Sequence, residues 1–249
     1  MFDPLRRVAR TTLKSLFHKL GADIVRLKNN PQETLVGLRH RPIRTVIDCG
    51  ANQGQFGRYI SRLFPEAALY CFEPLNEPYA ALSAWAATQK GRVRCFNVAL
   101  GDREGEAVMH HHLEHSPSSS LLAATDHEVA LFPQTARQSE VVVSVTTLDT
   151  VLADFMDGMA QDILLKLDVQ GYEDRVLRGA TRLLGKVQAC LLEVSVDPLY
   201  RGQASFKDLL MLLDASGLEY AGNLDQAYGE DGRVMWLDAL FVRCRSAQN

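Results

Sequence analysis

The chain has 249 residues, of which 47% are hydrophobic and 23% are charged. These values are typical of one globular domain with a substantial core, and no apolar run reaches the roughly 18 residues of a membrane span. The net charge is −3, but it is unevenly distributed: residues 1–44 carry ten Lys and Arg against three Asp and Glu, a charge of +7, so the remaining residues carry −10. An acidic body disfavours nucleic acid as a partner of the catalytic face.

The cysteines and the N-terminal segment bear on the cellular compartment in which the protein is expected. The five cysteines fall in or beside predicted strands without metal-ligand spacing, which is typical of small buried hydrophobes in a reducing cytoplasm. The first twenty residues lack the continuous apolar core and the small-residue cleavage site of a signal peptide. We therefore expect a cytoplasmic protein.

Residues 1–42 are predicted to form a basic helical arm. Apolar side chains recur at three- and four-residue steps over residues 4–28, with basic side chains between them, and Gly21 offers a point at which this helix divides in two. A short helix is expected over residues 32–41. Two interpretations of the arm stay open. Its apolar stripe packs on the domain or on a second subunit, or it forms a basic amphipathic surface for anionic lipid or a lipid-linked substrate at the membrane periphery.

Residues 45–56 read as a buried strand, a glycine-rich turn and the start of a helix. Gly50 and Gly54 allow a tight turn that a ligand can approach closely. The pattern is D-x-G-x-N-x-G, with Asn52 where a dinucleotide fingerprint requires glycine, and the lysine of a P-loop is missing. Asp48, at the end of the strand, would repel a pyrophosphate but would suit a ligand that carries an ammonium or sulfonium group.

A second predicted strand, residues 69–72, ends in Glu73. An acidic side chain at this position is placed to bind the two hydroxyls of a ribose. A turn that tolerates a cation and an acid that binds ribose together predict S-adenosylmethionine (SAM) as the ligand. The alternatives are an unused turn on a generic sheet and a nicotinamide enzyme, which the missing G-x-G disfavours.

The middle of the chain predicts a third strand and an insertion. The strand is expected over residues 93–100, with its end facing the adenine of the ligand. Residues 103–146 read as a hairpin or cap, with strands at 106–113 and 141–146, that would supply substrate contacts. The insertion contains three histidines at 110–112, but no Cys or carboxylate lies at ligand spacing. We therefore expect a solvated strand face or substrate contacts there and no metal site.

The remaining elements complete an α/β fold with a mostly parallel sheet and an antiparallel pair at one edge. The expected elements are a strand at 163–169, a helix at 172–184, a strand at 189–194, a helix at 206–215, and edge strands at 218–221 and 239–243 around a polar loop at 223–233. Ligands in such sheets bind beyond the carboxyl ends of the strands. Lys166 and Asp168 share one face of the fourth strand, and Glu193 lies in the fifth. They are candidate catalytic groups, or else a structural ion pair of Lys166 with Asp168 or Glu193.

Six segments carry a resemblance to a known family. In order, they are VIDCGANQGQF, CFEP, FNVALGD, TTLD, LLKLDVQGYEDRVLRGA and LLEV. Over roughly residues 43–243 the chain resembles the FkbM family of SAM-dependent methyltransferases, and the segment around Asp168 is the most specific. Many members of that family have Glu where this chain has Gln170. The difference removes one candidate base or metal ligand and weakens the case for a two-carboxylate magnesium site.

The resemblance implies a Rossmann-like class I methyltransferase domain over residues 43–249. It also implies an O-methyltransferase that acts on a hydroxyl of a sugar, glycolipid or polyketide-like product. A SAM-binding protein without activity and an N-methylating enzyme are the alternatives. The residues expected to bind the cofactor are Asp48, Gly50, Ala51, Asn52, Gly54, Phe56, Glu73, Pro74, Asn97, Val98, Ala99 and Asp168. The residues expected to act in catalysis are Lys166, Asp168 and Glu193, with Asp168 as the base or the group that orients the acceptor.

Overall fold

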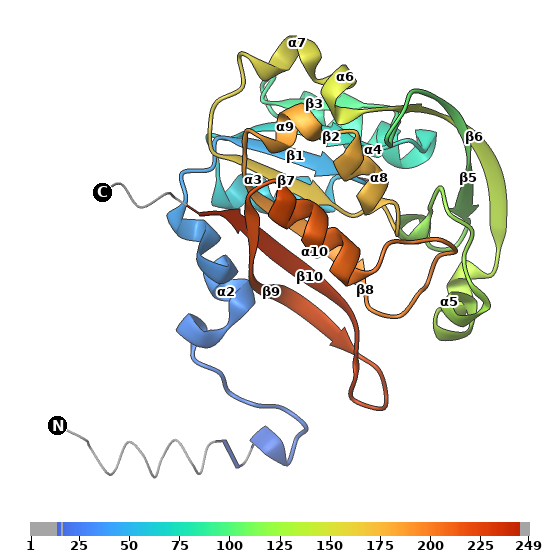
Figure 1. The fold of residues 1–249 in the computed structure, drawn as a ribbon. Coiled ribbons are helices and arrows are strands. Elements are labelled where there is room, and N and C mark those ends of the chain that lie inside the picture. The colour runs from blue at the N-terminus through green and yellow to red at the C-terminus, as the bar shows by residue number, and fades with distance from the viewer. Residues whose placement is uncertain (1–13, 16, 245–249) are drawn as a thin grey trace.

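The computed structural model describes residues 14, 15 and 17–244, and among them seven strands form the central sheet, in the order β3-β2-β1-β7-β8-β10-β9 (Figure 1). In that order the strands are Val93–Phe96, Ala68–Phe72, Thr45–Cys49, Ile163–Leu167, Val187–Ser195, Val234–Arg243 and Leu218–Tyr228. The first five run parallel, and β10 pairs antiparallel with both β8 and β9. The predicted α/β fold with an antiparallel edge pair is therefore confirmed.

Helices cover both faces of the sheet, which explains why the central strands are almost continuously apolar. Every residue of β1 and β7 is buried. One face packs against α3 (Gln55–Leu63) and α4 (Asn76–Ala87). The other face packs against α6 (Leu148–Val151), α7 (Ala153–Met156), α8 (Glu173–Arg178), α9 (Thr181–Leu184) and α10 (Phe206–Ala215). The polar side chains inside β1 and β7 are therefore exceptions that need partners.

The insertion forms a small second sheet beside the first. Its strands are β4 (Ala99–Leu100), β6 (Gln138–Thr146) and β5 (Gly105–His112), with β6 in the middle. The segment between β5 and β6 contains η3 (Ser116–Ser118), α5 (Asp126–Leu131) and η4 (Pro133–Thr135). The two strands expected in the insertion are present as β5 and β6.

The third strand was predicted too long. The chain leaves the central sheet after Phe96, and Ala99 and Leu100 pair with β6 instead. Asn97 holds this bend, because its side-chain amide donates hydrogen bonds to the carbonyl oxygens of Glu73 and Pro74, both at 3.0 Å. The side chain thereby ties the end of β3 to the end of β2.

Two further boundaries differ from the prediction. The helix expected over residues 172–184 is divided into α8 and α9 at Gly179, which packs so closely on Gly101 that a side chain would clash with the Gly101 carbonyl oxygen. The polar loop expected at 223–233 is strand up to Tyr228, because β10 supplies hydrogen-bond partners along that length. Polarity alone does not distinguish a loop from an edge strand whose outer face meets water.

Much of the expected N-terminal helix lies outside the described residues. Within the described part, Gly21 adopts a left-handed φ of 71°, and residues 22–26 are not helical, so the helix prediction is wrong there. The chain then forms η1 (Leu27–Asn29), α2 (Pro31–Thr34) and η2 (Leu35–His40), close to the short helix expected at 32–41. Leu35 and Leu38 bury this segment against the domain.

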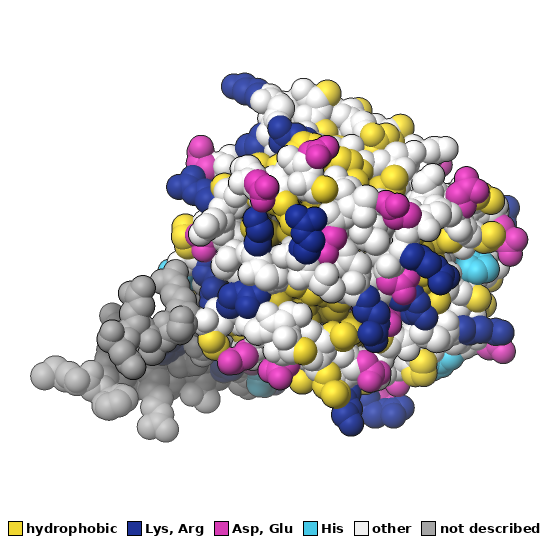
Figure 2. All heavy atoms as spheres, turned by 45° about the horizontal axis from the view of Figure 1, so that its top comes forward, with side chains coloured by type: hydrophobic (Ala, Val, Ile, Leu, Met, Phe, Trp, Pro, Cys, Tyr) yellow, Lys and Arg dark blue, Asp and Glu magenta, His cyan; other side chains and the backbone are white. Residues whose placement is uncertain are grey.

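The surface of the described part has two features that bear on partners. Figure 2 shows Lys and Arg interspersed with Asp and Glu on one face of the body, without a broad patch of one sign on its described residues. Large apolar side chains of the arm are exposed: Phe17, Leu20, Val25 and Leu27. Along the described residues, no helix has the length and apolar character needed to cross a membrane.

We predict that Gly179→Ala destabilises the protein by about 1–3 kcal/mol, the usual cost of overpacking, because the new methyl group would overlap the Gly101 carbonyl. Gly185→Ala is the matched control, since Gly185 also has a negative φ (−61°) and a Cβ there would lie 3.4 Å from the nearest atom. The free energy of unfolding in urea measures both. Equal stabilities would show that the contact does not constrain the fold.

Candidate active site

A cavity of about 460 Å³ lies beyond the carboxyl ends of the parallel strands. The strands of the central sheet, the segments that follow them and the start of α3 contribute Gly50, Ala51, Asn52, Phe56, Glu73, Pro74, Val98, Lys166, Asp168, Glu193 and Asp238 to its wall. The second sheet and the insertion contribute Ala99, Met109, Ser116, Pro117, Ser119 and Leu121. The three predicted catalytic residues are therefore brought together with most of the predicted cofactor residues. Three predicted residues, Asp48, Gly54 and Asn97, do not line it.

The turn after β1 is shaped by close packing as well as by the cavity. Gly50 has a φ of 80°, and a side chain there would clash with the carbonyl oxygen of Asp168, so only glycine lets the ends of β1 and β7 meet. Gly54, with a φ of 87°, begins α3 and faces α4, where a Cβ would lie 3.0 Å from Leu82 and 3.1 Å from Trp85. Close packing on α4 is thus one reason for glycine at this position, and the expected contact of Gly54 with a ligand stays a prediction.

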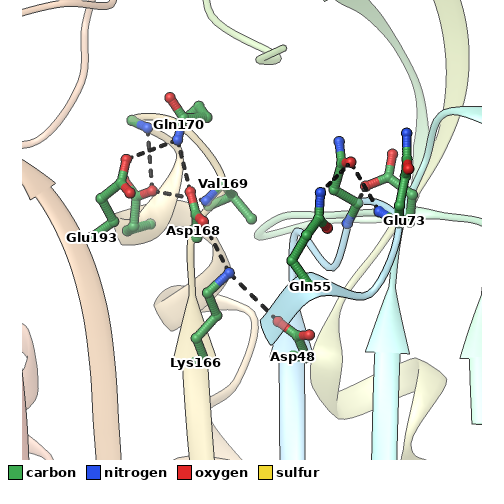
Figure 3. Close-up of polar contacts among 12 residues, drawn as sticks. Asp48, Gln55, Glu73, Lys166, Asp168, Val169, Gln170 and Glu193 are labelled. Carbon is green, nitrogen blue, oxygen red and sulfur yellow. Dashed lines mark hydrogen bonds and ion pairs between the residues drawn. The ribbon is translucent and has the colours of Figure 1, made fainter. Parts of the chain in front are cut away.

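Glu73 is a buried carboxyl group in the cavity wall (Figure 3). Its two oxygens accept hydrogen bonds from the backbone N–H groups of Asn52, at 2.9 Å, and Leu75, at 2.8 Å. Burial raises the pKa of Glu73 to about 7. The side chain therefore joins the turn after β1 to the end of β2, and its free lone pairs are available to hydroxyl donors.

Lys166 is the cation at the centre of the site. Its ammonium nitrogen lies 2.9 Å from Asp168 Oδ2, 3.5 Å from Asp48 Oδ1 and 5.4 Å from the centre of the Phe56 ring. Burial favours the neutral amine, but the two carboxylates outweigh it and raise the pKa of Lys166. Of the two ion pairs considered from the sequence, the pair with Asp168 is present, and Glu193 instead meets Gln170.

Asp48 has a different place from the one expected. Its carboxyl group is fully buried beneath the cavity, and neither oxygen accepts a hydrogen bond from a described residue. Burial raises its pKa, and the nearby Lys166 opposes that shift. The predicted direct contact of Asp48 with a cofactor cation is therefore replaced by a contact with a cation of the protein itself.

The sequence reasoning missed Asp238 and Tyr200 and considered Gln170 only as a lost base or metal ligand. Asp238, on β10, lies opposite Glu193 in the strand register, and Gln170 and Tyr200 form hydrogen bonds beside them. The Asp168 charge and burial raise the pKa of Glu193 to about 8, whereas burial and then Asp168 raise that of Asp238 to about 6. The pKa values of both carboxyl groups are therefore raised towards neutral pH. A polar residue amid the apolar run Trp236–Phe241 was the available signal for Asp238.

The insertion forms the roof of the cavity through its serines, and its histidines do not line it. Asn52 donates a hydrogen bond to Ser116 Oγ at 2.7 Å, across 64 residues of sequence. His112 is fully buried, and burial lowers its pKa to about 4. Among the described residues, no group of three or more His, Cys, Asp or Glu is arranged to hold a metal ion.

Known proteins resemble the chain over most of its length. The family model for the methyltransferase FkbM domain matches residues 48–223. The chain belongs to the FkbM methyltransferase family. As a member of this family it is a SAM-dependent methyltransferase.

Individual relatives agree with this family. The FkbM-family chain is 30% identical over 188 residues to the 2-O-methyltransferase NoeI of Sinorhizobium fredii (strain NBRC 101917 / NGR234). This match covers 72% of this chain and 74% of that protein. It is also 30% identical over 164 residues to the 31-O-demethyl-FK506 methyltransferase FkbM of Streptomyces tacrolimicus. This match covers 57% of this chain and 62% of that protein. The crystal structure of methyltransferase FkbM from Methylobacillus flagellatus matches 81% of this chain and 44% of that one, at 14% identity and a TM-score of 0.47.

We predict that Lys166→Met lowers the free energy of unfolding by about 3–5 kcal/mol at pH 7, because it leaves the buried Asp48 without a cation. The loss should shrink at lower pH, since the pKa of Asp48 is already raised and the protonated carboxyl needs no cation. Lys186→Met, at an exposed ion pair, should change stability by less than about 0.5 kcal/mol. If Asp48→Asn does not recover part of the loss in the double variant, Asp48 is not the group that requires Lys166.

Proposed function

We propose that this protein transfers the methyl group of SAM to a hydroxyl group of a sugar, glycolipid or polyketide-like natural product. The observation that carries the proposal is the Asp168 carboxylate, which lies in the cavity wall with a donor on each oxygen: Lys166 Nζ at 2.9 Å and Gln170 Nε2 at 2.7 Å. A carboxylate held in this way has one orientation. The names of two relatives, a 2-O-methyltransferase and a 31-O-demethyl-FK506 methyltransferase, also support a hydroxyl acceptor.

The residues of the cavity fit a SAM molecule by their chemistry. Glu73 would accept hydrogen bonds from the ribose hydroxyls. Val98, Ala99 and Leu100 offer an apolar surface of the kind that an adenine ring packs against. The turn at residues 50–52 would hold the amino-acid part, which carries both a carboxylate and an ammonium group. SAM would supply a methyl group that is already bonded to a good leaving group, the sulfonium sulfur.

The protein must then align the acceptor and take its proton. A hydroxyl is a weak nucleophile until a base acts on it, and a positioned general base contributes about 10²–10⁴-fold to the rate. Asp168 would accept the hydroxyl proton at whichever carboxylate oxygen faces the acceptor. Lys166 would hold Asp168 through their ion pair at 2.9 Å and would remain charged itself, since its raised pKa prevents it from acting as the base.

The arm extends this proposal to the partner of the protein. Phe17, Leu20 and Leu27 are exposed, and Lys19 and Lys28 lie among them. Apolar and basic side chains together would suit either a membrane that carries a lipid-linked acceptor or a second copy of the chain.

We predict that Glu73→Gln weakens binding of S-adenosylhomocysteine, the demethylated product of SAM, by about 1–3 kcal/mol, because an amide replaces one hydrogen-bond acceptor with a donor. Isothermal calorimetry measures the affinity. Glu77→Gln, at an exposed position in the first turn of α4, is the matched control and should bind like the wild type. Equal affinities for the two variants would place the ribose elsewhere.

The transfer itself is tested with SAM labelled in its methyl group and a panel of sugar, glycolipid and macrolide alcohols. We predict label in a base-stable ether of one class, and a turnover for Asp168→Asn that is about 10²–10⁴-fold lower than that of the wild type. Asp154→Asn, at an exposed carboxylate, is the control. Label on nitrogen would contradict the proposal. A turnover of folded Asp168→Asn equal to that of Asp154→Asn would remove Asp168 from the chemistry and leave it a structural role.

A further inference from the structure

Gln170 has an unusual set of contacts for a residue in a turn. It lies three residues after the end of β7 and adopts a left-handed φ of 55°, which non-glycine residues seldom do. Its backbone carbonyl accepts a hydrogen bond from Ser120 Oγ at 2.6 Å, and its side-chain oxygen accepts one from the Tyr200 hydroxyl at 2.7 Å. The turn is therefore held from two sides in a conformation that costs free energy.

The side-chain amide of Gln170 lies between two carboxyl groups. Its nitrogen donates to Asp168 Oδ1 at 2.7 Å and to Glu193 Oε1 at 2.9 Å, so each of its two protons has an acceptor (Figure 3). The reversed amide would turn its oxygen towards the oxygens of two carboxyl groups and would lose both hydrogen bonds to them when these are ionised. Tyr200 is 2% exposed, and its hydroxyl lies 2.7 Å from the amide oxygen of Gln170 and 2.9 Å from the carbonyl oxygen of Ser118.

These contacts matter because Asp168 and Glu193 would otherwise repel each other. Asp168 is the largest cause of the raised pKa of Glu193. The Lys166 ammonium forms ion pairs with Asp168 and Asp48, whereas Glu193 accepts a hydrogen bond from Gln170. A neutral amide that donates to both groups lets them lie side by side without adding charge to the cavity wall.

We propose that Gln170 is a positioning residue for methyl transfer, which holds the carboxyl groups of Asp168 and Glu193 as one hydrogen-bonded unit in the cavity wall. The inference rests on the proposed function for the role of Asp168. Gln170 donates to Asp168 Oδ1 and Lys166 donates to Asp168 Oδ2. The carboxyl group therefore has one orientation, which also fixes the direction of the lone pairs that bind neither donor. It also stabilises the ionised form of Glu193 against the charge of Asp168.

The experiment is a pH titration of the side-chain carboxyl carbons by NMR, with ¹³C-labelled Asp and Glu and with the Glu193 signal assigned from Glu193→Gln. Gln170→Leu removes both hydrogen bonds at similar size. The titration midpoint of Glu193 should then rise by about one pH unit, the scale of one hydrogen bond to a charged group. The other groups that face Glu193 are Asp168 and Lys166 from β7, and Asp238 from β10; all three are unchanged in the variant.

Gln170→Asn is the second variant and covers the case in which Gln170→Leu does not fold. Asparagine tolerates the left-handed conformation but is one methylene too short to reach both carboxyl groups, so the midpoint should again rise. Gln89→Leu, at the end of α4, is the matched control and should leave the midpoint unchanged. A Glu193 midpoint that stays at its wild-type value in folded Gln170 variants overturns the proposal and assigns Gln170 a purely structural role.

The titration needs neither cofactor nor acceptor. Failure to find a hydroxyl acceptor would therefore overturn the proposed function while leaving the measured coupling of Gln170 to Glu193 intact.

Discussion

The contact of the Lys166 ammonium with Asp48 and Asp168 is the constraint on which the site depends. One cation lies between two carboxyl groups at the point where β1 and β7 end, and Asp48 is wholly buried. Burying charges is costly unless they are paired, so removing the cation alone should destabilise this part of the sheet. The pairing also keeps a charged lysine in the cavity wall, where it orients Asp168. Stability and chemistry therefore rest on the same ion pairs.

The strand register brings further carboxyl groups close to Asp168, and their pKa values differ. β7, β8 and β10 bring Asp168, Glu193 and Asp238 next to one another at one edge of the cavity. The Asp168 charge and burial raise the pKa of Glu193 to about 8, whereas burial and then Asp168 raise that of Asp238 to about 6. Such separation lets neighbouring carboxyl groups serve as acid and base in one site. Gln170 moderates the repulsion without adding charge.

The insertion completes the cavity from a distance in sequence. Ser116 contacts the turn after β1, Ser120 holds the backbone of Gln170, and the single hydroxyl proton of Tyr200 lies between two acceptors, the carbonyl oxygen of Ser118 and the amide oxygen of Gln170. The roof and the carboxyl groups are thus parts of one hydrogen-bond network. The cavity has walls from the sheet and a cover from residues 116–121.

The sequence alone determined the α/β class, the antiparallel edge, the cofactor and the grouping of Lys166, Asp168 and Glu193, because strand period, glycine turns and motif order are local properties. Only the tertiary structure decided that Gly54 serves helix packing, that Asp48 faces Lys166, and that β9 continues through a polar stretch. It also added Asp238, Gln170 and Tyr200 to the site. These outcomes depend on which groups meet across the sheet and the insertion, and pairing of buried charges between distant segments leaves no periodic signal in the chain.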